Sequence, residues 1–209
     1  MRRHEMWMLI GFVAVLVLPA LRAQEYKADN ERAIAEIKKL GGKVQLDATR
    51  PGRPVVRVDL RHTKVVDASL EHLKGLTRLE ILNLRDTGIT DDGMGYVKGM
   101  TNLEVLELAR TKVTDKGLEQ LEGFTQLQRL DLGGTQVTDE GLRHLKGLTR
   151  LQRLSLDDTQ VTDAGLARLK GLTHLRKLNL DGTRVTRAAV HDLQKALPKV
   201  RMSHRPKSP

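Results

Sequence analysis

The sequence predicts an α/β solenoid of about six repeats, and two observations carry this prediction. A 24-residue unit recurs in register from about Leu76 to Lys195, and its sharpest copies are Phe124–Gly147 and Leu148–Gly171. Each unit joins a stretch of alternating residues, typical of a strand, to an apolar pair at the i, i+3 spacing of a helix. A fixed period of this length indicates a solenoid, in which each unit buries its apolar face against its neighbours.

The predicted core is aliphatic. Hydrophobic residues make up 39% of the chain but aromatic residues only 2%. After the first 23 residues the aromatic side chains are Tyr26, Tyr96 and Phe124. Leucine at fixed spacing must therefore fill the interior, which suits identical layers that need identical side-chain volumes.

Residues 1–23 have the three parts of a secretory signal peptide. Arg2 and Arg3 precede the apolar run Trp7–Leu18, and a proline and small residues follow it. The run is too short to span a bilayer comfortably. We predict cleavage after Ala23 and export to a periplasmic, envelope or extracellular location. The alternative is an uncleaved leader that anchors the chain to a membrane.

Residues 24–51 are predicted to form an N-terminal cap made of a helix and a strand. Ile34 and Ile37 have helical spacing within Ala28–Leu40, and Lys43–Asp47 follows two glycines as a candidate strand. We expect this cap to cover the open end of the repeat domain, residues 52–195. A degenerate first repeat, in which Val58 matches the inward leucine of later strands, opens that domain.

Within one repeat, the residue pattern separates a strand from a helix. In the first clear copy, Leu82 and Leu84 alternate on a short strand and point inward. Met94 and Val97 supply the apolar stripe of the following helix. Gly99 lies just past the helix end, where we expect a left-handed glycine cap.

A Thr-Asp step opens the helix of each repeat. Threonine at the N-cap accepts a hydrogen bond from a free helix N–H, and aspartate in the first turn is expected to face its own helix end. Because these carboxylates recur at one structural corner, we interpret them as caps rather than as metal or acid–base groups. The steps are Thr90-Asp91, Thr114-Asp115, Thr138-Asp139 and Thr162-Asp163.

A second threonine column follows the strands. Its hydroxyls are expected to bond to the backbone of the turn and to the next layer, as a structural ladder. The alternative, a binding column of hydroxyls, is disfavoured because the column is expected to be buried. Its members are Thr87, Thr111, Thr135, Thr159 and Thr183.

The pattern L-x-x-L-x-L-x-x-T-x-V-T-D-x-G-L resembles the leucine-rich repeat family, in particular the T-D-x-G-L class of F-box-associated and planctomycete-type bacterial proteins. The resemblance covers roughly residues 52–195. It implies a leucine-rich repeat solenoid that is curved, with parallel strands on the concave face and helices on the convex face. The threonine column stands where many members have Asn or Cys, and no F-box-like segment precedes the repeats.

The C-terminal end departs from the repeat. The copy that begins at Leu172 has Arg187 in place of aspartate and Ala189 in place of glycine, as expected of a terminal repeat. Residues 196–209 are predicted to form a C-terminal cap strand around Val200 and Met202, followed by a basic, disordered tail from His204 to the end.

The outward residues of the strands are the candidate binding residues. Neighbouring layers lie about 4.8 Å apart, so these residues form stripes. Arginine binds carboxylates through two parallel hydrogen bonds, which suits a polar protein or peptide. The alternative is that the charges pair across the stripe. The candidates are Arg129, Arg153 and Lys177 beside Asp157 and Asp181, with Arg61 and Arg85 as a second basic spot.

Enzymatic function is not expected. The chain has no cysteine, which excludes disulfides, thiolate chemistry and cysteine-based zinc sites. Its repeat-region histidines are scattered and lack metal-ligand spacing, and Gly133-Gly134 is a turn variant, not a phosphate-binding loop. We predict no catalytic, metal or cofactor site.

The resulting functional prediction is an exported, monomeric protein-binding or scaffold module that uses its concave face. The strand stripes lack Trp and Tyr, so binding is expected to be weak or charge-dependent. The net charge of +10 leaves open a basic envelope component that binds polyanions such as acidic glycans or nucleic acid. A structural spacer without a partner is the third possibility.

Overall fold

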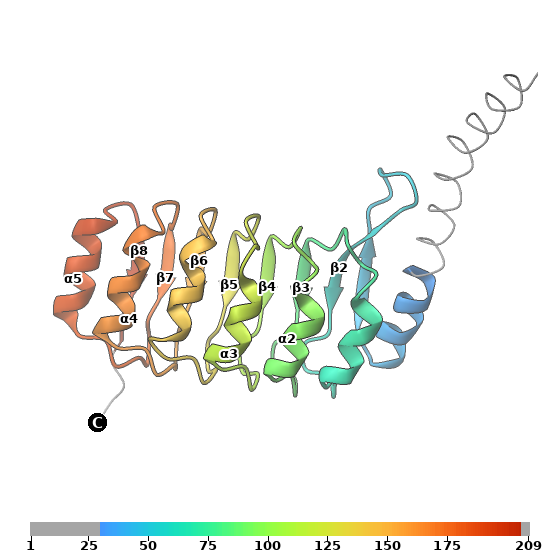
Figure 1. The fold of residues 1–209 in the computed structure, drawn as a ribbon, viewed down its shortest axis with the longest axis horizontal. Helices are drawn as coiled ribbons and strands as arrows, with labels where there is room; N and C mark the ends of the chain where they lie inside the picture. Colours follow the sequence, from blue (N-terminus) through green and yellow to red (C-terminus); the bar gives the residue numbers. More distant parts are fainter. Residues whose placement is uncertain (1–29, 206–209) are drawn as a thin grey trace, which may run out of the picture.

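The computed structural model describes residues 30–205 and shows one continuous solenoid (Figure 1). Eight strands form a single sheet in chain order, β1 to β8. β1 is antiparallel to β2, and every later pair is parallel. The strands are β1 (Lys43–Leu46), β2 (Val55–Asp59), β3 (Ile81–Asn83), β4 (Val105–Glu107), β5 (Arg129–Asp131), β6 (Arg153–Ser155), β7 (Lys177–Asn179) and β8 (Arg201–Ser203).

Helices cover one face of this sheet and leave the other face open. The same T-D-x-G-L sequence forms an α-helix in some layers and a 3₁₀ helix in others, because such short segments are within the length range of either form. The helices are η1 (Asp67–Leu73), α2 (Asp91–Val97), α3 (Asp115–Leu118), η2 (Glu119–Leu121), η3 (Gly141–Gly147), α4 (Asp163–Arg168), η4 (Leu169–Gly171) and α5 (Arg187–Ala196). We call the open face of the sheet the concave face.

The core is a stack of leucines between strands and helices. Leu82, Leu106 and Leu130 lie opposite one another on neighbouring strands and are 0–1% exposed. Phe124 is fully buried where most other layers have leucine. The predicted aliphatic core is confirmed, because each layer contributes the same small set of side chains to the same positions.

The aspartates of the Thr-Asp steps link neighbouring layers, which differs from the prediction. Asp91 does not serve its own helix: its Oδ1 accepts from the backbone N–H of Thr114, at 2.8 Å, and its Oδ2 accepts from the Thr114 hydroxyl, at 2.7 Å. The same pair of bonds joins Asp67, Asp115, Asp139 and Asp163 each to the threonine 23 residues later. The threonines cap their own helices as predicted; Thr114 accepts from the N–H of Lys116.

This link explains the glycine of the T-D-x-G-L motif. A Cβ placed on Gly117 would lie 2.5 Å from the Oδ1 of Asp91, and one on Gly141 would overlap the carboxylate of Asp115 in the same way. Glycine is therefore required by the carboxylate of the preceding layer. The terminal repeat has Arg187 in place of aspartate, and no further helix follows α5 among the described residues to receive such a bond.

The second threonine column closes turns within its own layer. The Thr135 hydroxyl donates to the carbonyl oxygen of Leu132 at 2.6 Å, and Thr135 is only 4% exposed. Equivalent bonds occur at Thr63, Thr87, Thr111, Thr159 and Thr183. The structural interpretation of this column is supported, but its hydroxyls bond within the layer rather than to the next one.

The expected glycine cap at Gly99 is wrong. Helix α2 ends at Val97, and its C-cap residue, Lys98, has a right-handed helical conformation. Among the glycines at the equivalent position of each repeat, Gly75, Gly99, Gly123, Gly147 and Gly171, only Gly123 has a positive φ, of 94°. Left-handed residues instead occupy the turn that follows each strand. Asp86, Arg110 and Asp158 hold φ values of 53–55° there although they carry side chains.

Both ends of the stack are covered. At the N-terminal end, a helix that includes residues 30–39 buries Ala33 and Ile37 in the core, next to β1. At the C-terminal end, β8 pairs with β7 through Met202 and Leu178. His204 and Arg205, which we expected in a disordered tail, are bonded to Val185 and Asp181 of the last layers.

The leader and the end of the tail lie outside the described residues, as do the predicted cleavage site and residues 24–29. Within residues 30–205, none of the helices has the length and apolarity that a membrane crossing requires.

Candidate functional site

The concave face carries a column of basic side chains. Arg129, Arg153, Lys177 and Arg201 lie opposite one another on β5 to β8, and we call these four residues the basic column. All four are exposed, because the leucine that follows each of the first three, and Met202 after Arg201, takes the inward position of the strand. The parallel register thus confirms the alignment of the first three residues, and it adds Arg201.

The basic column is largely free of partners within the molecule. Among the described residues, Arg153, Lys177 and Arg201 form no ion pair, and Arg129 reaches only Glu107, at 3.9 Å. The column borders a shallow concavity of about 520 Å³ that extends from Glu107 to Ser203 across β4–β8. Anionic groups of a partner could therefore reach these cations without displacing an internal carboxylate.

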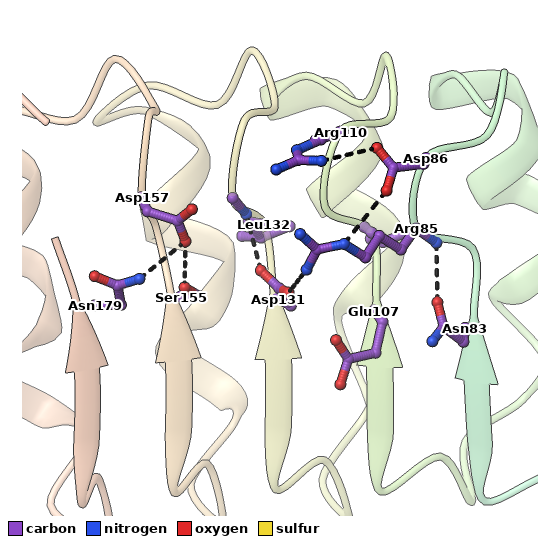
Figure 2. A network of polar contacts seen from close by, with 12 residues as sticks. Asn83, Arg85, Asp86, Glu107, Arg110, Asp131, Leu132, Ser155, Asp157 and Asn179 are labelled. Atoms are coloured by element: carbon purple, nitrogen blue, oxygen red, sulfur yellow. Dashed lines mark hydrogen bonds and ion pairs between the residues drawn. The ribbon is translucent and has the colours of Figure 1, made fainter. Parts of the chain in front are cut away.

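The second predicted basic spot is different, because its arginines are paired. The Arg85 guanidinium bridges Asp86 and Asp131, each at 3.4 Å, and Arg61 lies 3.2 Å from Asp59. Figure 2 shows Arg85 extending from the end of β3 toward Asp131 on β5. Asp86 also contacts Arg110, so a compact charge network occupies this part of the face. The structure does not bring Arg61 and Arg85 together with the basic column.

The two predicted aspartates lie beyond the ends of β6 and β7, four residues after the basic residues of those strands, and serve internal bonds. Asp157 accepts hydrogen bonds from the Ser155 hydroxyl and from Asn179 Nδ2, the latter at 3.1 Å (Figure 2). Asp181 accepts from the backbone N–H of Arg205 at 2.8 Å. Both carboxylates keep acceptor capacity, since a carboxylate has about four lone-pair sites.

The polar residues at the ends of the strands also close turns. The side-chain oxygens of Asn83, Asp131 and Asn179 accept from the backbone N–H two residues later, at 3.0–3.1 Å. This is the local bonding for which Asn and Asp are favoured in turns. These half-buried residues therefore have a structural role.

Glu107 and Asp131 are neighbouring carboxylates between the charge network and the basic column. Burial is the main cause that raises the pKa of Glu107 above its ordinary 4.5, and the charge and hydrogen bonding of Asp131 raise it further. Arg129 and Arg85 oppose this rise. Repulsion between like charges and desolvation both favour the neutral carboxyl at this position.

Sequence reasoning missed Arg201 and the Glu107–Asp131 pair. Arg201 follows Lys177 by 24 residues, so the repeat period itself places it in the column. It was missed because the repeat motif breaks down after Lys195. The carboxylate pair has no local signal, since its two members come from different repeats.

Metal-binding geometry is not found in the part of the chain that the structure describes. No group of three or more His, Asp or Glu side chains there is arranged to hold an ion. Many of the acidic residues instead bond between layers, close turns or join the charge network.

Comparisons with known proteins agree with this architecture. Residues 77–137 match the leucine rich repeat family model. The crystal structure of an internalin, inlF, from Listeria monocytogenes superposes with a TM-score of 0.56 at 20% identity, over 86% of this chain and 55% of the internalin. The PEPR1–AtPEP1 structure gives a TM-score of 0.52 at 15% identity, over 78% of this chain and 23% of its own.

These likenesses bear on the fold alone at such identities. The chain spans about half the length of the internalin that it matches. A search of curated sequences gives no match. Residues 77–137 thus match the leucine-rich repeat family, and the seven parallel strands β2–β8 continue the same layered arrangement on both sides of that match.

Proposed function

We propose that this chain is a non-enzymatic protein-binding module whose concave face holds the partner. The observation that supports it most is the basic column, which is exposed on parallel strands that pair in register. Like charges on neighbouring strands are unfavourable in the free molecule. Unpaired cations on neighbouring strands are explained if an anionic group of a partner binds them and offsets their mutual repulsion.

The rest of the face supports binding rather than chemistry. The carboxylates near the column are held by internal hydrogen bonds, and the polar strand ends close turns. A rigid surface with prearranged charges lowers the ordering cost of binding. We further propose that the chain acts after export as a monomer, consistent with its leader sequence, and that it belongs to the T-D-x-G-L class of bacterial repeat proteins.

Cross-linking in the native envelope, followed by mass spectrometry, tests this function. The tagged full chain should retain a protein partner, and Arg129→Glu with Arg153→Glu should abolish retention. The matched control is Lys146→Glu with Lys170→Glu, which changes the same charge on the helical side, where both lysines are exposed and form no ion pair within residues 30–205. Circular dichroism and melting curves establish that both variants fold.

Equal retention by the concave-face variant and its control would contradict the proposal. Retention of glycan or nucleic acid in place of protein would instead favour the polyanion-binding alternative. A chain that retains nothing would favour a structural spacer.

A further inference from the structure

We infer that the segment held by the concave face is an extended acidic peptide, with carboxylates at alternate positions, lying across β5–β8 along the basic column. This inference rests on the proposed function and specifies the partner's chemistry. Three observations support it: the cations of the basic column are largely unpaired, their spacing matches an extended peptide, and the residues around them suit a peptide.

The unpaired positive charge of the basic column favours an anionic ligand. Three of the four cations lack any ion pair among the described residues, and the contact of Arg129 with Glu107 is long, at 3.9 Å. In contrast, Arg61 and Arg85 at the other end of the face are already paired. An anionic segment therefore has its counter-charges at β5–β8 and not at β2–β3.

The spacing fits alternate residues of an extended chain. The four cations occupy consecutive strands, so the column spans three intervals of about 4.8 Å, roughly 14 Å. An extended peptide rises about 3.3 Å per residue, so side chains at i, i+2 and i+4 share one side and span ~13 Å. Three carboxylates in this arrangement can reach the four flexible basic side chains together.

The surroundings favour a peptide over other polyanions. Asp157 and Asp181 follow the ends of β6 and β7 and keep acceptor capacity, which suits the backbone N–H groups of a peptide, whereas a phosphodiester backbone has no N–H to donate. No aromatic residue lines the concavity, whereas single-stranded nucleic acids bind largely by stacking on aromatic rings.

Fluorescence polarisation with labelled peptides on the full chain tests the inference. The probe is DSDSDSD, and its control is DDSSSDD, which has the same composition but does not place three carboxylates on one side. We expect the alternating probe to bind more tightly. Arg153→Gln with Lys177→Gln should weaken it about tenfold, because two charge pairs with the peptide are lost. Lys146→Gln with Lys170→Gln on the helical side should leave its affinity unchanged.

Equal affinity for the two peptides would overturn the extended geometry. Tighter binding of oligothymidylate or of a sulfated glycan would overturn the peptide assignment. If a protein is retained through the concave face but DSDSDSD does not bind, this inference fails while the proposed function stands. If no protein is retained, the proposed function fails whatever the peptides do.

Discussion

At the scale of single residues, one carboxylate per layer serves two purposes. Asp115 accepts from the N–H and the hydroxyl of Thr138, at 2.8 and 2.6 Å, and thereby positions the N-cap of the next helix. It also occupies the space that a side chain at Gly141 would need. The threonine, the aspartate and the glycine of the motif are thus one interaction that extends over two repeats.

A double-mutant cycle tests this coupling. Asp115→Ala removes two buried or half-buried hydrogen bonds and should cost about 1–3 kcal/mol. Gly141→Ala alone should also destabilise, because its methyl group meets the Asp115 carboxylate. In the Asp115→Ala background the same methyl should cost much less, since mainly the flexible end of Leu118 remains close, at 3.0 Å. Denaturant unfolding measures the four free energies.

Gly147→Ala is the matched glycine control. A Cβ at Gly147 would meet nothing within 4 Å, so this substitution should be neutral or slightly stabilising. Additive effects of Asp115→Ala and Gly141→Ala would show that the carboxylate is not what requires glycine.

Glu107 gives a pH-dependent prediction at the same scale. Because its pKa is raised in the folded chain, the stability contributed by its protonated form is full below pH 4.5 and is lost as pH rises through the folded pKa. Glu107→Gln should therefore raise the melting temperature at pH 7 by a few degrees and by progressively less toward pH 4. Thermal melts across this range measure it.

Glu119→Gln, on the exposed helical side, is the control for that series and should show no such gain. A melting temperature for Glu107→Gln that falls at pH 7 would mean that the pairing of Glu107 with Arg129 outweighs its repulsion from Asp131.

At the scale of elements, the strands and the helices place side chains at different spacings. Neighbouring strands lie about 4.8 Å apart, whereas packed helices lie about 8–10 Å apart. Equivalent charges from consecutive layers are therefore closer on the concave face than on the helical face. Two unit charges at 4 Å interact by ~1 kcal/mol in water, so the basic column costs stability in the free molecule.

Arg153→Gln with Lys177→Gln should accordingly stabilise the fold by up to about 1 kcal/mol at low salt. The gain should shrink in 1 M salt, where the Debye length falls to ~3 Å. Lys146→Gln with Lys170→Gln should give a smaller gain. Urea unfolding at two ionic strengths measures these differences, and a destabilised concave-face variant would show that the column has counter-charges in the free molecule.

At the scale of the whole molecule, stability is shared between neighbouring layers and the structures at the two ends. Ile37 is 1% exposed where the N-terminal helix meets the first layer. In a stack each layer contacts mainly its neighbours, so damage at one end should propagate only partly along the chain.

Ile37→Ala should lower stability by about 2–4 kcal/mol, as expected for a large-to-small change in a core. Hydrogen exchange should show that β1 and β2 lose protection while β5 and β6 keep most of theirs. Uniform loss of protection along the sheet would indicate that the molecule unfolds as one cooperative unit.

The sequence predicted most of this fold because its repeats are local and identical. Leu82, Leu106 and Leu130 lie in register as the period requires. It did not predict the partner of Asp91, since a side chain in a first helical turn can bond to its own helix or to the next layer. The candidate site was predicted in part: the alignment of Arg129 with Lys177 follows from the period, whereas the pairing of Arg85 with Asp131 spans three layers and has no local signal.

The interlayer bonds also have a direction along the chain. Each aspartate serves the threonine of the following repeat, so for this bond a helix start depends on the layer before it and not on the layer after it. During synthesis the N-terminal layers leave the ribosome first. A completed layer would then already present its carboxylate when the next helix start emerges, so the solenoid can be assembled in the order in which it is translated.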